Sequence, residues 1–563
     1  MNNKKEKILL AFLPFWTPYI PPQGITILKR FLSHHGYEVK TVDLNIDQKL
    51  RNHYDLYFTK LREFIPYEYR GNFVNIGHDV MLNHMLAHVN QTDISKYKEL
   101  VNIIVYQTYF YNISDKQIDE LISILEGMYE MLGKKLHEIL IHEKPTIFGA
   151  TAYSGTLASC MFSYRLVKKH FPHIKTVIGG GSFSDHLVIG TPNFAKFFEK
   201  SDYIDKIIIG PGHLLFLRWL EGKLPEEKKV YTADDLNGET IPINESWDLP
   251  DLSDLDTSDY LYTAITGSRS CPFSCSFCNV KKFWGQHKTK DAKQIVSEFR
   301  TLYNKTGSQL FFCYDALLNS HIDQLSEELI NSELSVYYVG YLRVCDEACD
   351  IKNTIKWRRG GFYRARLGVE SGSQHVLDLM DKRITVKQIK GTIRNLAKAG
   401  IKTTVYIVIG HPEETEEDFQ ASLDLIEELR NDIWEAECNP FNYYYSNQNS
   451  SDNWASKRQL VYPEFATDML IAQTWTLDVD PLRKEVYDRM GRFVRHCDKL
   501  GIPNPYSIND IYKADERWKK LQKNAVPSII ELKDPNNYID ECKYVKELVS
   551  TQGSMKEDLE FSF

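Results

Sequence analysis

The sequence predicts an α/β protein with an N-terminal doubly wound, Rossmann-like domain, a central partial (β/α) barrel and a mainly helical C-terminal region. Short apolar strand candidates alternate with helix candidates in the first third of the chain, and the same alternation restarts at Tyr260 after a polar, acidic stretch. The 563 residues, with 43 % hydrophobic side chains, are enough for about three domains with buried cores.

The first domain is expected over residues 1–222. Its strand candidates are residues 7–15, 37–44, 146–154, 175–181 and 205–210, and its helix candidates are 23–35, 156–170 and a segment ending at residue 220. Such alternation indicates a parallel sheet, whose ligand crevice lies at the carboxyl ends of the strands. Residues 46–140 are mainly helical and too long for an ordinary connection. We interpret them as an inserted cap or substrate wall.

A polar linker is predicted over residues 223–259 and a barrel over residues 260–432. The barrel's strand candidates are LYTAIT, QLFFCYD, SVYYVGYLR, FYRARLGVE and KTTVYIVIG, and its helix candidates are residues 291–303, 322–330, 386–398 and 416–429. Repeated strand–helix units favour a complete or partial barrel with its site at the C-terminal strand ends. Residues 433–563 are expected to form a C-terminal substrate or capping region.

The stretch GSRSCPFSCSFCNV places Cys271, Cys275 and Cys278 in a C-x3-C-x2-C pattern. Three thiolates in one loop can hold three irons of a 4Fe-4S cluster and leave the fourth iron open to a small molecule. A structural zinc site needs four protein ligands, and no second C-x-x-C or H-x3-H lies nearby. Ten cysteines in the chain is ordinary usage for a reduced compartment, which disfavours disulfides. The triplet is therefore interpreted as an iron–sulfur motif.

The segment LYTAITGSRSCPFSCSFCNVKKFWG resembles the cluster loop of the radical S-adenosylmethionine (SAM) superfamily. In that superfamily the open iron chelates the amino and carboxylate groups of SAM, and Phe277 matches the aromatic position near adenine. The stretches GVESGSQHVLDLMDK and VIGHPEET also resemble segments that follow the fourth and fifth barrel strands of the family. The resemblance implies a partial radical SAM barrel that binds a 4Fe-4S cluster and SAM, with an electron donor such as a flavodoxin or ferredoxin.

Three residues of these two stretches are expected to bind SAM. Glu370 and Ser371 offer acceptors for ribose hydroxyls, and Gly410 would let the backbone approach adenine. Family members usually have glycine at the position of Glu413, and this departure puts the local turn in doubt.

Two residues at the ends of earlier strands are further SAM candidates. Asp315, in the pattern D-x-x-x-N with Asn319, resembles the place where the ammonium of SAM is held, and it is equally a candidate helix N-cap. Arg343 could bind the SAM carboxylate in a bidentate manner or close a structural ion pair.

The N-terminal domain resembles the cobalamin-binding domain often fused to radical SAM barrels, through residues 21–45 and the stretches ATAYSG, VIGGGSFS and IIIGPG. Ser154, Gly180 and Gly181 would line the crevice for the nucleotide tail. There is no D-x-H-x-x-G motif, so no histidine is evident as a lower cobalt ligand. Pro211 and His213 stand where relatives typically have acidic residues. A structural Rossmann-like domain without cobalamin is the alternative.

The other cysteines give no clear indication of a metal site. Cys345 and Cys349 could hint at an auxiliary cluster, but no recognisable spacing assembles four ligands. The remaining cysteines are expected to be small buried hydrophobes.

The leading prediction is a cobalamin-dependent methyltransferase that cleaves SAM to a 5′-deoxyadenosyl radical and methylates an unactivated carbon of a small metabolite or peptide. The first alternative is a radical cyclase, epimerase or rearrangement enzyme without methyl transfer. The second is a non-catalytic cobalamin or redox sensor, against which the intact cysteine triplet argues.

The composition excludes some partners and compartments. A net charge of −8 argues against a general nucleic-acid binder. No apolar run approaches the length of a membrane span, and nothing near MNNKKEK resembles a signal peptide, so a cytoplasmic location is predicted.

Overall fold

The computed structural model describes residues 6–240, 249–446, 448–504 and 508–533. The chain divides into two compact units, of which the first comprises Met1–Tyr260 and Asn442–Tyr487 and the second Leu261–Phe441 and Asp488–Phe563. Each unit contains a six-stranded sheet in which all neighbouring strands are parallel. The predicted α/β class is therefore confirmed. No helix in the described ranges is long and apolar enough to cross a membrane.

The sheet of the first unit has the strand order β2-β1-β3-β4-β5-β6. Its strands are β1 (Lys7–Phe12), β2 (Glu38–Asp43), β3 (Ile147–Thr151), β4 (Lys175–Gly179), β5 (Lys206–Ile208) and β6 (Val230–Tyr231). The helices between them are α1 (Gln23–His34), α6 (Leu157–His170), α7 (Ser182–Asp185), α8 (Pro192–Glu199) and α9 (Gly212–Leu220). Because β1 pairs with β2 on one side and β3 on the other, the switch point of the sheet lies at the carboxyl ends of β1 and β3.

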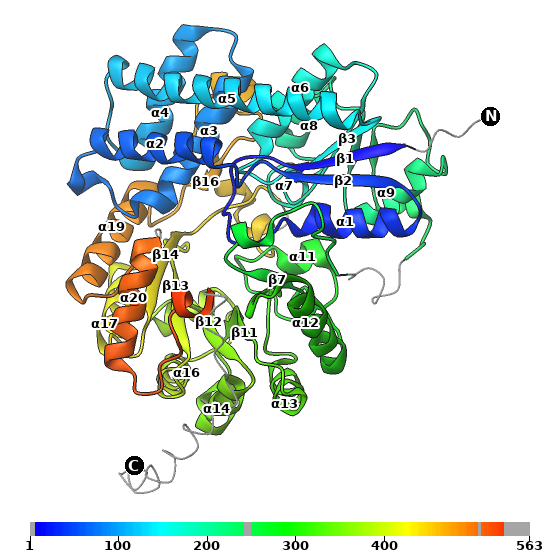
Figure 1. The fold of residues 1–563 in the computed structure, drawn as a ribbon. Coiled ribbons are helices and arrows are strands. Elements are labelled where there is room, and N and C mark those ends of the chain that lie inside the picture. The colour runs from blue at the N-terminus through cyan, green and yellow to red at the C-terminus, as the bar shows by residue number, and fades with distance from the viewer. Residues whose placement is uncertain (1–5, 241–248, 447, 505–507, 534–563) are drawn as a thin grey trace, which may run out of the picture. The chain divides into compact units, whose positions relative to one another are not determined.

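Four helices occupy the predicted insertion between β2 and β3: α2 (Gln48–Phe64), α3 (Phe73–Asn90), α4 (Ile94–Tyr109) and α5 (Asp115–Glu143). In Figure 1 they form a helical group of their own, coloured blue to light blue, beside the sheet of the same unit. A capping box at Ser114, whose hydroxyl accepts from the backbone of Gln117, starts the long helix α5.

The division of the chain differs from the predicted boundaries at two places. Within the predicted linker, β6 extends the first sheet, and Asp254 forms an ion pair with Lys29 of α1 at 2.6 Å. Within the predicted C-terminal region, the first unit takes up α18 (Thr467–Leu470), β15 (Arg458–Leu460) and β16 (Trp475–Leu477). Both differences depend on contacts between distant residues, which local patterns do not reveal.

The sheet of the second unit has the strand order β14-β13-β12-β11-β10-β7. Its strands are β7 (Thr263–Ile265), β10 (Leu310–Cys313), β11 (Tyr337–Arg343), β12 (Phe362–Glu370), β13 (Lys402–Ile409) and β14 (Glu435–Pro440). Six parallel strands joined by helices form the predicted partial barrel. A short antiparallel hairpin, β8 (Ser268–Arg269) with β9 (Lys288–Thr289), follows the first strand.

Helices of the second unit cover one face of this sheet, as the green and yellow part of Figure 1 shows. They are α12 (Ala292–Thr306), α13 (Ile322–Ser332), α14 (Ile351–Arg359), α15 (Gln374–Leu379), α16 (Val386–Lys398) and α17 (Glu416–Glu428). The short helix α11 (Val280–Trp284), in which no residue is buried, lies between β8 and β9 along the chain. Three further helices follow: α19 (Arg483–Lys499), which begins in the first unit, α20 (Ile508–Leu521) and α21 (Ile529–Lys533). Alternate β12 side chains, among them Ala365, Leu367 and Val369, are fully buried on the helix-covered face.

Candidate functional site

The three predicted cluster cysteines lie on the loop that follows the β7 strand of the second unit. Cys275 is buried, Cys271 and Cys278 are half-buried, and all three are free thiols. The Ser270 hydroxyl donates to the carbonyl oxygen of Gly285 at 2.6 Å and closes the base of the loop. The loop thus presents three sulfur atoms that form no disulfide, within eight residues.

Burial and mutual proximity affect the protonation of the thiols in the loop. Burial raises the pKa of Cys271 and raises that of Cys278 to about 11, and neighbouring thiols of the triplet add to both shifts. In the described ranges, no three His, Cys, Asp or Glu side chains gather around one ion position. A 4Fe-4S cluster requires no such gathering, because each thiolate binds its own iron. The donor set of three thiols therefore fits a 4Fe-4S cluster.

Arg343 ends β11 and reaches the cysteine loop. Its Nη1 donates to Cys275 Sγ at 3.5 Å, and its Cζ lies 3.8 Å from the ring centroid of Phe273. The Asn319 side chain holds the backbone of Arg343. Asn319 Oδ1 accepts from the Arg343 N–H at 2.8 Å, and Asn319 Nδ2 donates to the Arg343 carbonyl at 2.9 Å. Arg343 Nη2 is buried without a hydrogen-bond partner, and the side chain has no ion pair within the described residues. A donor is thus left for an acceptor such as the SAM carboxylate.

Asp315 ties the end of β10 to the start of the cysteine loop. Its Oδ2 accepts the Gly267 N–H at 3.0 Å, whereas its Oδ1 has no hydrogen-bond partner among the described residues and lies 3.8 Å from His321 Nε2. The alternative of Asp315 as a helix N-cap is wrong, because α13 starts at Ile322 with His321 in the cap position. One carboxylate oxygen is therefore left for a cation.

Glu370 ends β12 and forms a buried ion pair with Lys382 at 2.5 Å. A Cβ at Gly368 would lie 2.6 Å from Glu370 Oε1, so the glycine leaves room for this pair. Lys382 Nζ also lies 5.8 Å from the ring centroid of Phe277. Two predicted SAM residues, Glu370 and Phe277, are thus joined by a lysine that the sequence analysis did not single out. Its place within the same family-like stretch is the signal that could have indicated it.

Ser371 is placed differently from its predicted role. Its side chain is fully buried, and its hydroxyl lies 3.3 Å from the Ser422 hydroxyl of α17 and accepts the Ser373 N–H at 3.1 Å. A Cβ at the adjacent Gly372 would lie 2.3 Å from the carbonyl oxygen of Ala421, so strand and helix are in close contact here. The Ser371 hydroxyl therefore has a packing role and is not presented to a ribose.

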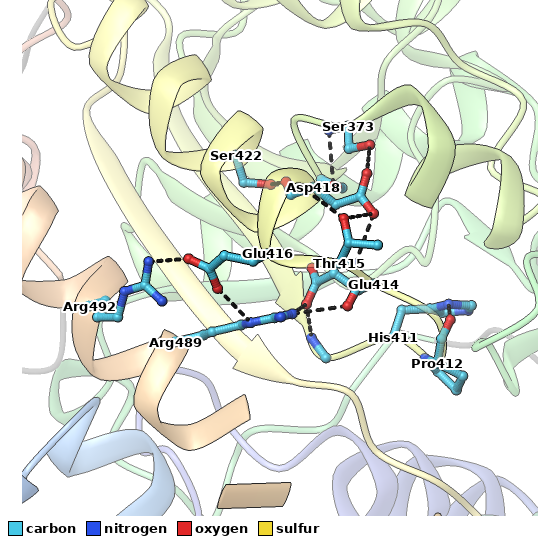
Figure 2. A network of polar contacts seen from close by, with 12 residues as sticks. Ser373, His411, Pro412, Glu414, Thr415, Glu416, Asp418, Ser422, Arg489 and Arg492 are labelled. Atoms are coloured by element: carbon cyan, nitrogen blue, oxygen red, sulfur yellow. Dashed lines mark hydrogen bonds and ion pairs between the residues drawn. The ribbon is translucent and has the colours of Figure 1, made fainter. Parts of the chain in front are cut away.

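Gly410 begins the turn after β13 and has a φ of +86°. Its N–H donates to Glu414 Oε2 at 2.7 Å, and Arg489 Nη1 donates to the same carboxylate at 3.0 Å and to the Glu414 carbonyl at 3.1 Å. Figure 2 shows Arg489 reaching from α19 to this turn. Burial raises the pKa of Glu414 to about 7, against the opposing effects of the Gly410 N–H and Arg489. Arg489 lies far along the chain from the motif, and no local pattern indicates it.

His411 connects the same turn to the cysteine loop. Its Nε2 lies 3.3 Å from the Ser276 hydroxyl and its Nδ1 lies 2.9 Å from the Pro412 carbonyl oxygen. Burial lowers the pKa of His411 to about 4, so the imidazole is neutral near pH 7. The Ser276 N–H donates to the Met380 carbonyl at 2.9 Å. The cysteine loop is thereby anchored to segments that follow β12 and β13.

Glu413, the departure from the family pattern, has a φ of +74°, in the left-handed region that favours glycine. We expect Glu413→Gly to stabilise the protein by about 0.5–1 kcal/mol, because the relief of left-handed strain exceeds the added freedom of the unfolded chain. Glu417→Gly is a matched control, since Glu417 lies in helix α17 and should lose stability on the same change. Thermal unfolding checks both variants, and a less stable Glu413→Gly protein would contradict the prediction.

The predicted cobalamin residues lie at strand ends of the first unit. A Cβ at Gly180 would lie 2.6 Å from the Ala152 carbonyl oxygen, and one at Gly181 would lie 2.8 Å from the ring of Tyr153. The backbone at Gly180 and Gly181 therefore packs closely against the segment at residues 151–153. At the switch point, the ring of Trp16, which is 38 % exposed, stacks on Tyr153 at 5.0 Å. This half-exposed aromatic pair, with Ser154 beside it, fits the flat apolar face of a large cofactor.

Comparison with known proteins relates this geometry to a family. Residues 265–426 match the model of the Radical SAM superfamily. The anaerobic magnesium-protoporphyrin IX monomethyl ester cyclase of Rubrivivax gelatinosus is 27 % identical over 314 residues, which cover 52 % of this chain and 55 % of the cyclase. The chain thus spans about half the length of the curated relatives it matches.

Two solved structures share the architecture. The radical SAM methyltransferase TsrM from Kitasatospora setae, with cobalamin and a 4Fe-4S cluster bound, aligns with a TM-score of 0.56 over 97 % of this chain and 100 % of TsrM. The cobalamin-dependent radical SAM enzyme OxsB, with aqua-cobalamin and SAM bound, aligns with a TM-score of 0.51 over 93 % and 57 % of the two chains. Sequence identity is 13 % in both alignments, so the likeness shows a common fold. The predicted fold, a Rossmann-like domain combined with a partial barrel, is confirmed.

Proposed function

We propose that residues 265–426, which match the model of the Radical SAM superfamily, cleave SAM to methionine and a 5′-deoxyadenosyl radical. The cysteine loop carries this proposal. Arg343 Nη1 donates to Cys275 Sγ while Arg343 Nη2 is buried without a hydrogen-bond partner among the described residues, and Asp315 holds the start of the loop through the Gly267 N–H. A 4Fe-4S cluster on that loop supplies one electron to SAM. The proposed external donor is a flavodoxin- or ferredoxin-like protein.

In this proposal the chain's own residues orient SAM through charge and shape. Arg343 Nη2 binds the carboxylate, and Asp315 Oδ1 accepts from the ammonium. Glu370 accepts from the ribose hydroxyls while Lys382 holds its carboxylate in place. Phe277 and the glycine backbone at residue 410 border the adenine. The buried position of these groups strengthens each polar contact with the bound cofactor.

For the reaction itself, we propose cobalamin-dependent methylation of an unactivated carbon in a small metabolite or peptide. The shared fold of TsrM and OxsB over both units supports this choice. Bound cobalamin supplies a transferable methyl group. In the first unit, Trp16 and Tyr153 at the switch point provide the apolar face on which the cofactor would rest.

A second candidate is a radical cyclisation or rearrangement without methyl transfer. The specific observation in its favour is the 27 % identity to an anaerobic cyclase of magnesium-protoporphyrin IX monomethyl ester.

Cobalt binding separates these candidates. We expect the full chain, reconstituted anaerobically with iron, sulfide and hydroxocobalamin and then desalted, to retain about one cobalt per chain, and Trp16→Ala to retain several-fold less. Phe198→Ala, which removes another exposed ring of the first unit, is the matched control and should retain cobalt.

Cobalt is measured by elemental analysis and SAM products by chromatography. SAM cleavage to 5′-deoxyadenosine without retained cobalt would transfer the assignment to the second candidate. A protein that neither cleaves SAM nor retains cobalt would contradict both candidate functions.

A further inference from the structure

One face of the second sheet carries three charged side chains of β12, at alternate positions. Two of them are matched by partners: Arg364 pairs with Glu435 at 2.9 Å, and Glu370 pairs with Lys382 at 2.5 Å. Arg366 lies between them and, among the described residues, makes neither a hydrogen bond nor an ion pair, and its Nε is buried. A buried donor without an acceptor is costly, so this arginine requires an explanation.

Aromatic rings from three neighbouring strands surround the Arg366 guanidinium. Its Cζ lies 5.6 Å from the ring centroid of Phe312, 5.1 Å from that of Tyr341 and 5.4 Å from that of Tyr406. The rings hold the cation by cation–π attraction but accept none of its N–H groups in a conventional hydrogen bond. The site is also accessible, since Tyr341 in the central strand β11 is 39 % exposed.

A second donor at the same place lacks an acceptor. The hydroxyl of Tyr406 is buried and has no hydrogen-bond partner among the described residues. Burial raises the pKa of Tyr406 well above its ordinary value, so the hydroxyl keeps its proton and can only donate to an anion. Burial lowers the pKa of Arg366, and the charge of the Glu437 carboxylate in β14 raises it. No ion pair within 4.0 Å joins Arg366 to Glu437.

We propose that Arg366 and Tyr406 bind a carboxylate group of the substrate, deepening the proposed function on which this inference rests. A planar carboxylate can accept from the guanidinium fork and from the tyrosine hydroxyl together. The aromatic rings then pack against the apolar group that bears the carboxylate. The substrate class is therefore a small carboxylic acid with an apolar or aromatic body.

The position of Arg366 also limits the size of that substrate. Arg366 and Glu370 lie four residues apart on β12, and the Glu370 carboxylate lies on the side of the strand to which a Gly368 side chain would point. The strand is irregular between Gly368 and Glu370, so the two positions are at most roughly 13 Å apart. If SAM lies at Glu370, the carbon that loses hydrogen lies between these two positions. That carbon is then within several bonds of the carboxylate, as in a compound of the size of an amino acid or a short acyl chain.

Binding of phenylacetate and of its uncharged amide, phenylacetamide, tests this inference on the full chain by ligand-observed NMR. We expect saturable phenylacetate binding and at least about tenfold weaker phenylacetamide binding, because the amide offers no charge to the guanidinium. Arg366→Met should weaken phenylacetate binding by at least about tenfold, and Tyr406→Phe several-fold. Tyr406→Phe should fold normally, since it removes a hydroxyl that has no partner.

The matched control is Arg300→Met, which removes an exposed arginine of α12 and should leave phenylacetate binding unchanged. Three results would overturn the inference. They are equal affinity for phenylacetate and phenylacetamide, phenylacetate binding that is unchanged in both Arg366→Met and Tyr406→Phe, and no binding of either probe. The experiment needs no reduced cluster and no SAM cleavage. A chain that binds phenylacetate through Arg366 but forms no 5′-deoxyadenosine would contradict the proposed function alone.

Discussion

Cys271→Ala, Cys275→Ala and Cys278→Ala are each expected to abolish the broad visible absorbance of the reconstituted protein and all formation of 5′-deoxyadenosine from SAM. Each thiolate binds a different iron, so any one substitution leaves an iron without its protein ligand. Iron and sulfide analysis, the visible spectrum and product chromatography measure the effect.

Cys345→Ala and Cys349→Ala are matched controls for the same experiment. Cys349 Sγ contacts the Gln388 carbonyl oxygen at 3.4 Å and Thr392 Oγ1 at 3.6 Å, both protein groups on α16. Cys345 Sγ likewise contacts a protein group, since it accepts from Asn319 Nδ2 at 3.2 Å. Both control variants should therefore keep the cluster absorbance. Full iron content and full SAM cleavage in any variant of the triplet would refute the ligand assignment, whereas iron loss in the controls would support an auxiliary cluster.

Local patterns predicted most of the fold because its strands are short, apolar and regularly spaced. The fourth barrel strand was predicted over FYRARLGVE, and β12 spans Phe362–Glu370. In contrast, β14 was not predicted, because its sequence EAECNP carries two glutamates. Glu435 is nevertheless fully buried in β14, since Arg364 neutralises it from β12. Only the pairing of residues far apart in the sequence makes this segment a strand.

In the candidate site, too, local sequence patterns indicated some residues, whereas others depend on contacts between distant parts of the chain. Asp315, Arg343 and Glu370 were indicated by their places at strand ends, and the structure gives each a polar neighbour on the cysteine loop or in the following segment. Ser371 matched the same motif, but its hydroxyl contacts α17, which the motif does not describe. Arg366 was not singled out, because only the three surrounding rings distinguish it from an ordinary strand arginine.

Arg489→Met is expected to destabilise the second unit by about 3–5 kcal/mol, because it leaves the Glu414 carboxylate buried without its cation. The two side chains are only 2 % and 1 % exposed, and the same carboxylate oxygen holds the Gly410 N–H. Loss of the arginine should therefore also loosen the turn proposed to border adenine. The unfolding temperature should fall by roughly 10 °C. Arg492→Met is the matched control, since Arg492 pairs with the half-exposed Glu416 (Figure 2) and should cost less than about 1 kcal/mol.

The loss of stability caused by Arg489→Met should be smaller at low pH, because the Glu414 carboxylate becomes protonated there. Burial raises the folded-state pKa of Glu414 to about 7, above its ordinary value of 4.5, so the folded chain binds a proton there more readily than the unfolded chain. Stability linked to this group therefore rises as pH falls from about 7 toward 4.5 and is lost as pH rises. Without Arg489 the carboxyl titrates higher still, and protonation removes the unpaired buried charge. Arg489→Met should consequently be closer to wild type at pH 5.5 than at pH 8, as measured by thermal unfolding at both values. An equal loss at both would show that packing of the arginine, and not its charge, stabilises the turn.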